Sequence, residues 1–357
     1  MERVDTRQPE WDFAKAILII FVVWGHVCSY ISDANYERNA LTSVIRLYQM
    51  PMFILISGYF QKECFSFLDI KAKLVKIIQT LCIPYICWCA IGSILVIGTN
   101  AVINTEIACM GYNIIRLFAQ QFSILWYLGC LILCEAVYAI VSYLSERMWG
   151  GFLLLSLSLS VILPVDIYHF SFLWPFFVLG VIFRRKNLVE SFEKRPRHIV
   201  LIACAVLLCF AQFYKTEDTF YNSPNYLLSL GVLGIPQQLF FVFYRYIVYG
   251  LTTIVFLCMF FMVYKQMKDN RVADIFLNIG RNTLGMFLIH ILFLYQVFRP
   301  IVEKCTDGEG LLPNHPIARY YLIGTLISVL AITLSYMLTR YINSNRLLKR
   351  ILLGRTK

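Results

Sequence analysis

Long apolar segments alternate with short polar ones along nearly the whole of this chain of 357 residues. Most of them approach the roughly 20 residues that an α-helix needs to cross the apolar core of a bilayer. Ten can be marked, at about residues 13–31, 44–60, 74–97, 123–144, 149–164, 170–183, 197–214, 239–264, 283–302 and 318–342. The fifth and sixth are short, so we expect them to be tilted or partly re-entrant. The pattern predicts an all-α fold, a polytopic integral membrane bundle of about ten transmembrane helices, in which residues 1–357 form a single domain.

Composition and charge favour the same fold. Hydrophobic residues make up 59% of the chain and charged residues only 15%, which excludes an ordinary soluble domain. If the N-terminus is cytoplasmic, 22 of the 32 lysines and arginines fall in segments on the inner side and 4 in segments on the outer side. This bias predicts an even number of spans, with the N- and C-termini cytoplasmic. We expect the protein to lie in the plasma (inner) membrane. It also accounts for the net charge of +11 without a nucleic-acid partner.

The first apolar segment carries a line of polar side chains on one face. Asp12 and Lys15 stand near its start, and His26 follows Lys15 by eleven residues. At 100° per residue, Lys15 and His26 lie within about 20° of each other around the helix, with Asp12 on the same side. The rise per residue places His26 about 16 Å beyond Lys15, toward the middle of the membrane, where ionisable groups are costly and usually functional. The plainer alternative is that His26 only hydrogen-bonds a neighbouring helix, while Asp12 and Lys15 mark the membrane edge.

The second and third segments add a close-packing motif and a basic cluster. Ser57 and Gly58 offer a small surface that another helix or a thin ligand can approach closely. Lys71, Lys73 and Lys76 precede the third segment. Composition alone favours topological anchoring and attraction to anionic membrane lipid for these lysines, but ammonium groups beside a membrane cavity also suit a phosphorylated ligand.

Further polar side chains interrupt later segments. We expect Glu135 to be paired with a cation or protonated. Arg46 and Arg245 are deep or interfacial cations that either orient a polar substrate or extend to the membrane surface. His290 is a second histidine within the membrane, either beside His26 in a shared cavity or a structural hydrogen-bond partner. His169 lies on an outer connection, where we expect a solvated loop residue first and an acceptor contact second. The twelve cysteines are scattered singly, so we predict neither a metal site nor a disulfide framework.

Several of these motifs occur in an order that resembles the acyltransferase-3 superfamily of integral membrane acyltransferases. They are the basic residue and histidine separated by ten residues (Lys15 to His26), the stretch MPMFILISGY in the second segment, the lysine cluster ahead of IPY, LWYL (Leu125 to Leu128) in the fourth segment, and TLGMFLIH in the ninth. The resemblance covers nearly the whole chain. Lys15 stands where many members have arginine, and Gln49 where members often have histidine.

The resemblance implies a cytoplasmic acyl-CoA donor, most often acetyl-CoA, and a polysaccharide or other glycan as acceptor on the opposite side. Under this interpretation the basic inner mouth, formed by Lys15, Lys73 and Lys76, holds the phosphorylated end of the donor, and Asp12 orients Lys15. His26 acts as the general base on an acceptor hydroxyl, because an imidazole exchanges a proton near neutral pH. The candidate residues of the cavity are Arg46, Ser57, Glu135, Arg245 and His290.

Two other functions fit the same sequence. A proton-coupled secondary transporter or flippase would use His26, Glu135 and His290 as a proton relay, and ten spans suit such a protein. A noncatalytic membrane partner of an assembly is the third reading. Release of free CoA from acetyl-CoA in the presence of an acceptor glycan would distinguish the enzyme from both.

Overall fold

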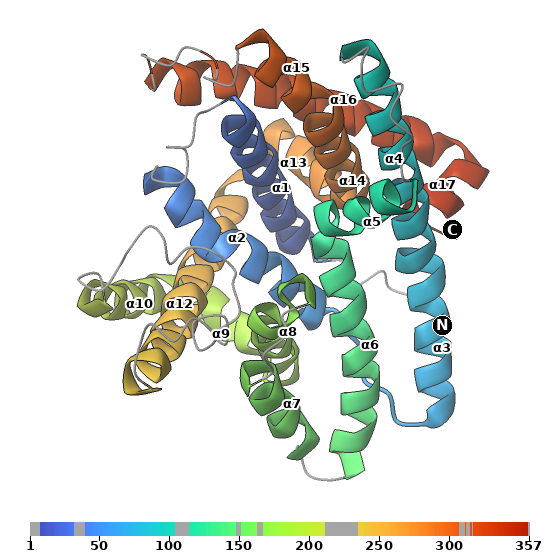
Figure 1. The fold of residues 1–357 in the computed structure, drawn as a ribbon. Coiled ribbons are helices and arrows are strands. Elements are labelled where there is room, and N and C mark those ends of the chain that lie inside the picture. The colour runs from blue at the N-terminus through green and yellow to red at the C-terminus, as the bar shows by residue number, and fades with distance from the viewer. Residues whose placement is uncertain are drawn as a thin grey trace.

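A computed structural model describes residues 8–31, 40–103, 114–147, 151–162, 167–210, 235–306, 311, 315 and 317–355 of the protein. These residues are almost entirely helical, and no β-strand occurs among them. The helices, drawn in Figure 1, are α1 (Pro9–Tyr30), α2 (Ala40–Tyr59), α3 (Phe67–Ile77), α4 (Ile83–Ile103), α5 (Ile114–Ile124), α6 (Trp126–Arg147), α7 (Gly151–Ile162), α8 (Phe170–Arg185), α9 (Leu188–Lys194), α10 (Pro196–Phe210), α12 (Ile235–Met267), α13 (Arg271–Arg281), α14 (Thr283–Phe293), α15 (Arg299–Cys305), α16 (Gly324–Ser344) and α17 (Arg346–Leu353), joined in places by the short helices η2 (Ile78–Cys82), η4 (Ile167–His169), η7 (Leu294–Phe298) and η8 (Ala318–Ile323).

Eight helices within the described part of the chain are long and apolar enough to cross a membrane. They coincide with eight of the ten segments expected from the sequence, and α3, η2 and α4 together form one of them, Phe67–Thr99. The other two expected segments contain α7 and α10, for which the structure describes 12 and 15 helical residues. The protein is therefore a polytopic helical membrane protein, as expected, while the count of ten spans and the orientation of the termini stay predictions.

Helix α1 lies at the centre of the bundle (Figure 1) and packs against α2, α12, α13, α14 and α16. Pro9 at its first turn needs no backbone donor there, and the apolar residues that follow are buried on several sides. The closest approach is at Gly280 of α13, where a Cβ atom would lie only 1.8 Å from the carbonyl oxygen of Asp12. Glycine thus allows α13 to lie directly against the polar start of α1.

A second close crossing fixes α2 against α8. A Cβ atom on Gly58 would lie 2.0 Å from the carbonyl oxygen of Phe177, and one on Gly180 would lie 2.0 Å from that of Leu55. The small surface expected at Gly58 is thus a helix contact. It holds α2, which carries Arg46 and Ser57, at a fixed distance from α8.

The break between α13 and α14 fixes the position of the start of α14. Asn282 stands between the two helices, and its Nδ2 donates to the carbonyl of Asn278 at 2.8 Å. Asn343 donates to the side-chain oxygen of Asn282 at 3.0 Å, and Arg355 donates to Asn343 at 3.0 Å. These bonds tie the start of α14, and with it His290, to the end of the chain.

Candidate active site

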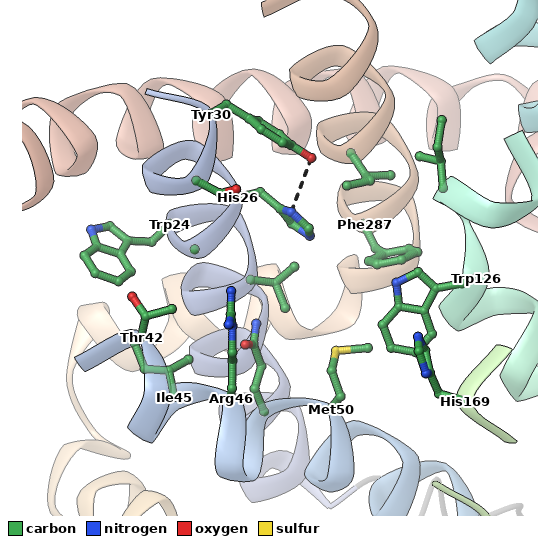
Figure 2. Close-up of a pocket in the computed structure, with 16 residues that line it drawn as sticks. Trp24, His26, Tyr30, Thr42, Ile45, Arg46, Met50, Trp126, His169 and Phe287 are labelled. Carbon is green, nitrogen blue, oxygen red and sulfur yellow. Dashed lines mark hydrogen bonds between the residues drawn. The ribbon is translucent and has the colours of Figure 1, made fainter. Parts of the chain in front are cut away.

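A cavity of about 370 Å³, which we call the histidine cavity, opens beside the second half of α1. Its walls come mainly from α1, α2, α6 and α14, as Figure 2 shows. The side chains and backbone that line it are Val22, Trp24, Gly25, His26, Ser29, Tyr30, Thr42, Ile45, Arg46, Gln49, Met50, Ile124, Trp126, His169, Phe287 and Ile291. None of the described lining residues is an aspartate or glutamate, and the ionisable groups among them are His26, Tyr30, Arg46 and His169.

His26 is half-buried and projects into this space from α1. Its Nδ1 atom lies 3.5 Å from the hydroxyl oxygen of Tyr30, one turn further along the helix (Figure 2). Tyr30 in turn contacts the ring of Tyr295 and the guanidinium of Arg299. Arg46 rises from α2 toward the same space (Figure 2). The cavity therefore brings together an imidazole, a phenol and a guanidinium, which can move a proton and stabilise developing negative charge.

His290 lies directly behind this arrangement on α14. Its ring centroid is 5.6 Å from that of His26, and only 1% of the residue is exposed. Nδ1 is 2.8 Å from the carbonyl oxygen of Met286, and because a carbonyl can only accept, Nδ1 carries the proton. The structure thus brings together the two histidines that the sequence placed in the membrane.

The opposite wall of the histidine cavity is aromatic. The rings of Trp126 and His169 are 4.8 Å apart in an edge-to-face arrangement (Figure 2). Tyr168 and His169 both adopt left-handed backbone conformations, with φ of 54° and 57°, which is strained for residues other than glycine. This turn places the half-buried His169 in the lining of the histidine cavity. Its two expected roles, a solvated loop residue and an acceptor contact, stay predictions.

A second cavity of about 160 Å³, which we call the lysine cavity, lies beside the first half of α1. It is mostly apolar, and its lining residues are Lys15, Ile19, Val22, Met50, Phe53, Ile56, Ser57, Leu81, Tyr127, Leu131, Thr283, Leu284 and Phe287. Three side chains, Val22, Met50 and Phe287, line both cavities, and we call them the apolar partition. The two cavities therefore adjoin, with Lys15 on one side of the partition and His26 on the other.

Asp12 lies between two cations near the start of α1. Its carboxylate is 2.7 Å from Nζ of Lys15 and 3.7 Å from Nε of Arg281, and only 3% of Asp12 is exposed. The Lys15 side chain keeps 24% of its surface exposed. Asp12 thus holds Lys15 in place at the rim of the lysine cavity, and the group of three carries one net positive charge.

The remaining candidates lie outside both linings. Lys73 donates a hydrogen bond to the side chain of Gln61 and lies over the ring of Tyr138 at 5.4 Å. Glu135 accepts a hydrogen bond from Gln61 and has Lys73 as its main cationic neighbour, in agreement with the expected paired carboxylate. Lys76 is exposed.

Arg245 is buried and stacks over the ring of Phe172 at 5.0 Å. Of the five candidate cavity residues, Arg46 and Ser57 line cavities, His290 lies against His26, and Glu135 and Arg245 line neither. Among the side chains that the structure describes, no group of three or more His, Cys, Asp or Glu is placed to hold a metal ion.

Sequence reasoning did not single out three residues of the site, Tyr30, Trp126 and Phe287. A signal was present for Tyr30, which follows His26 by four residues and must share its helix face. Trp126 and Phe287 lie within motifs already noted, LWYL and TLGMFLIH, but only the fold shows that they face His26.

Helices able to cross a bilayer, with a histidine and a lysine in adjoining cavities between them, define an integral membrane protein with a buried polar site. Residues 8–340 match the acyltransferase domain family, acyltransferase-3. The match covers most of the chain, and the protein therefore belongs to this family of acyltransferases.

Two curated relatives are similar to the chain. The nodulation protein NolL of Sinorhizobium fredii is 24% identical over 235 residues, which cover 61% of this chain and 61% of that protein. The nodulation protein NolL of Mesorhizobium japonicum is 22% identical over 303 residues, which cover 80% of this chain and 76% of that protein. The chain thus spans about three fifths of the length of the first relative. No solved structure matches it.

Proposed function

We propose that the protein transfers an acyl group, typically acetyl, from cytoplasmic acyl-CoA to a hydroxyl group of a polysaccharide or other glycan on the opposite side of the plasma membrane. Membership of the acyltransferase-3 family supports the reaction class. The observation that carries the proposal is the pair of adjoining cavities on one face of α1. Lys15 lines one and His26 the other, about 16 Å apart along the helix.

The lysine cavity suits the donor. A CoA thioester combines a phosphorylated nucleotide with a long, thin pantetheine arm. The positive charge at Lys15 attracts phosphate. Lys73 and Lys76 lie outside the lining of this cavity, and we propose that they add a weaker attraction for the phosphorylated end of the donor. The lining of this cavity is mostly apolar, so it suits the arm better than the charged nucleotide, and the thioester approaches the apolar partition while the nucleotide stays outside.

The histidine cavity suits a sugar. Its aromatic walls, Trp24, Tyr30 and Trp126, offer flat apolar surfaces that pack against the C–H faces of a pyranose ring. Polar side chains between them, including Thr42 and Gln49, supply hydrogen-bond donors and acceptors for hydroxyl groups. A cavity of this size and mixed character is typical of small-molecule sites.

The reaction needs one proton transfer and one exchange of acyl bonds. His26 removes the proton of the acceptor hydroxyl while the oxygen attacks the thioester carbonyl. The new C–O bond forms, the C–S bond breaks, and His26 returns the proton to the departing sulfur, so that CoA leaves as the free thiol. Arg46, a permanent cation in the cavity lining, can stabilise the negative charge that develops on the carbonyl oxygen.

Replacing His26 tests the proposal directly. We expect His26→Ala to lower turnover by at least the roughly 10²–10⁴-fold that a general base contributes, while the protein still inserts and stays monodisperse. His26→Gln keeps a hydrogen-bonding side chain, so it should restore stability without restoring turnover. Release of free CoA from acetyl-CoA measures the effect, with surface polysaccharide isolated from the cells that carry the protein as acceptor.

Sidedness is tested in sealed vesicles with acetyl-CoA confined to the cytoplasmic side. Product should appear only on acceptor on the opposite side. Full activity of either His26 variant would contradict the role of His26. Product found only on the donor side would contradict transfer across the membrane and leave the acyltransferase assignment intact.

A further inference from the structure

His290 has a free acceptor atom in a place where buried polar atoms normally have partners. The ring donates from Nδ1 to the carbonyl of Met286, so its other nitrogen, Nε2, carries a lone pair. Nε2 is fully buried and has no hydrogen-bond partner among the residues that the structure describes. A buried unsatisfied acceptor is destabilising, and native proteins retain one where it serves a further purpose.

The nearest histidine to this acceptor is His26. The two rings are 5.6 Å apart between centroids and inclined by 43°, a separation from which a small rotation of either ring brings two nitrogens into hydrogen-bonding range. Nδ1 of His26 faces the hydroxyl of Tyr30 on the cavity side. The nitrogen of His26 that is left for His290 is therefore Nε2.

We propose that His290 is a positioning residue that accepts a hydrogen bond from Nε2–H of His26 during turnover. This inference rests on the proposed function of His26 as general base. Because Nε2 of His290 can only accept, it fixes the tautomer of His26 that carries its proton on Nε2. Nδ1 of His26 then holds the lone pair, beside Tyr30 and within the histidine cavity where the acceptor hydroxyl binds.

The hydrogen bond strengthens as the reaction proceeds. When His26 takes the proton of the acceptor hydroxyl on Nδ1, the ring becomes an imidazolium and Nε2–H becomes a charge-assisted donor. His290 keeps its own proton on Nδ1, and the proton that His26 gained leaves on the sulfur of CoA. A third group that orients a catalytic imidazole is a recurring arrangement in acyl transfer, but here the orienting group is a neutral imidazole in an apolar surrounding.

Two substitutions separate this role from a structural one. His290→Asn retains a donor that can reach the carbonyl of Met286, as Asn282 donates to the carbonyl four residues before it at 2.8 Å, but it removes the atom at the Nε2 position. His290→Gln loses the bond to Met286 and places an amide oxygen close to the Nε2 position. A structural histidine is better replaced by Asn, whereas a positioning histidine is better replaced by Gln.

The test measures kcat and KM for acetyl-CoA with isolated surface polysaccharide as acceptor, together with the thermal unfolding temperature of each purified variant. We expect His290→Asn to keep its KM and its folded structure but to lose about 10²-fold in kcat, as a misplaced catalytic group does. His290→Gln should remain within about tenfold of the wild-type kcat, a loss of ~1.4 kcal/mol at most.

The opposite ranking, or a folded His290→Asn variant with wild-type kcat, would overturn the inference. If His290→Gln does not fold, the folded His290→Asn variant decides alone by its kcat. Loss of activity in His26→Ala with full activity in both His290 variants would refute this inference and leave the proposed function standing. Full activity in His26→Ala would remove the basis of both.

Discussion

Asp12 is a buried carboxylate that keeps a lysine at the rim of a membrane cavity. With 3% of its surface exposed, it depends on Lys15 and Arg281 to compensate its charge. Removing one partner of such a buried group is costly, because the other charge is left without compensation. Asp12 thus holds the cation of Lys15 in a defined place. The group of Asp12, Lys15 and Arg281 keeps one net positive charge, which can attract an anionic ligand.

Lys15 and Lys76 should differ in what they contribute to donor binding. Lys15 lines the lysine cavity and is held by Asp12, whereas Lys76 is exposed to solvent. We expect Lys15→Gln to raise the KM for acetyl-CoA about tenfold, and Lys76→Gln to raise it no more than about threefold, because exposed charges are screened. Initial rates at low and high salt measure both, and the salt dependence should weaken most in Lys15→Gln.

Lys73→Gln is the matched comparison, since Lys73 is engaged by Gln61 and Tyr138. It should lower the unfolding temperature more than it raises the KM. A larger rise in KM for Lys76→Gln than for Lys15→Gln would show that the donor binds along α3 rather than at the lysine cavity.

Helix α2 supplies wall residues to both cavities, and α8 determines where it lies. Arg46 and Gln49 face the histidine cavity, Ser57 faces the lysine cavity, and Met50 faces both. The paired contacts of Gly58 and Gly180 bring the backbones of α2 and α8 together without intervening side chains. Small residues at this crossing therefore set the width of both cavities.

Adding one methyl group at this crossing should disturb the site. We expect Gly180→Ala to lower the stability of the protein by about 1–3 kcal/mol, because the new Cβ meets the backbone of α2 and the helices must move apart. Turnover should fall with it, since α2 carries Arg46. Thermal unfolding in detergent and CoA release measure the two effects.

The control is Gly250→Ala in α12, where a Cβ would meet no atom within 4 Å. The same substitution there should leave stability unchanged or raise it slightly, since alanine favours a helix over glycine. Equal losses in the two variants would mean that the crossing of α2 and α8 is not tightly packed.

At the scale of one helix, the sequence predicts well which residues lie on the same face. The spacing of Lys15 and His26 follows from helix geometry alone, and Gly58 is identified as a contact because small residues let backbones approach. What it does not predict is which helices meet. Phe287 lines the histidine cavity from a segment more than 250 residues away from His26. The contact between these two segments depends on the packing of the whole bundle. The place of His169 in the cavity lining is hidden from the sequence for the same reason, because only the fold shows where its left-handed turn puts the side chain.

At the scale of the whole molecule, charge decides which end of the bundle faces the cytoplasm. The 22 to 4 distribution of basic residues predicts that α9 and α17 lie inside and α15 outside. Under the proposed function, this predicted orientation would place the lysine cavity on the donor side and the histidine cavity toward the acceptor.

Labelling with a membrane-impermeant maleimide on intact cells tests this orientation. Cys305 in α15 is the one exposed side chain among the described free cysteines, so it should react from outside. Lys194→Cys and Arg350→Cys, at exposed positions of α9 and α17, should react only after the membrane is opened. Cys305→Ser provides the background for both. Labelling of either new cysteine on intact cells would reverse or break the predicted topology.

The apolar partition has a consequence for the energy balance of the cell that carries this protein. Each elementary charge that crosses a membrane at 100 mV dissipates about 2.3 kcal/mol of stored energy. Two water-filled cavities joined end to end would form a continuous path for ions and would dissipate the membrane potential. Val22, Met50 and Phe287 interrupt such a path with three side chains that neither conduct nor bind a proton. In the proposed transfer, the thin arm of the donor would pass between these side chains and fill the gap, so the membrane would stay insulating throughout the reaction.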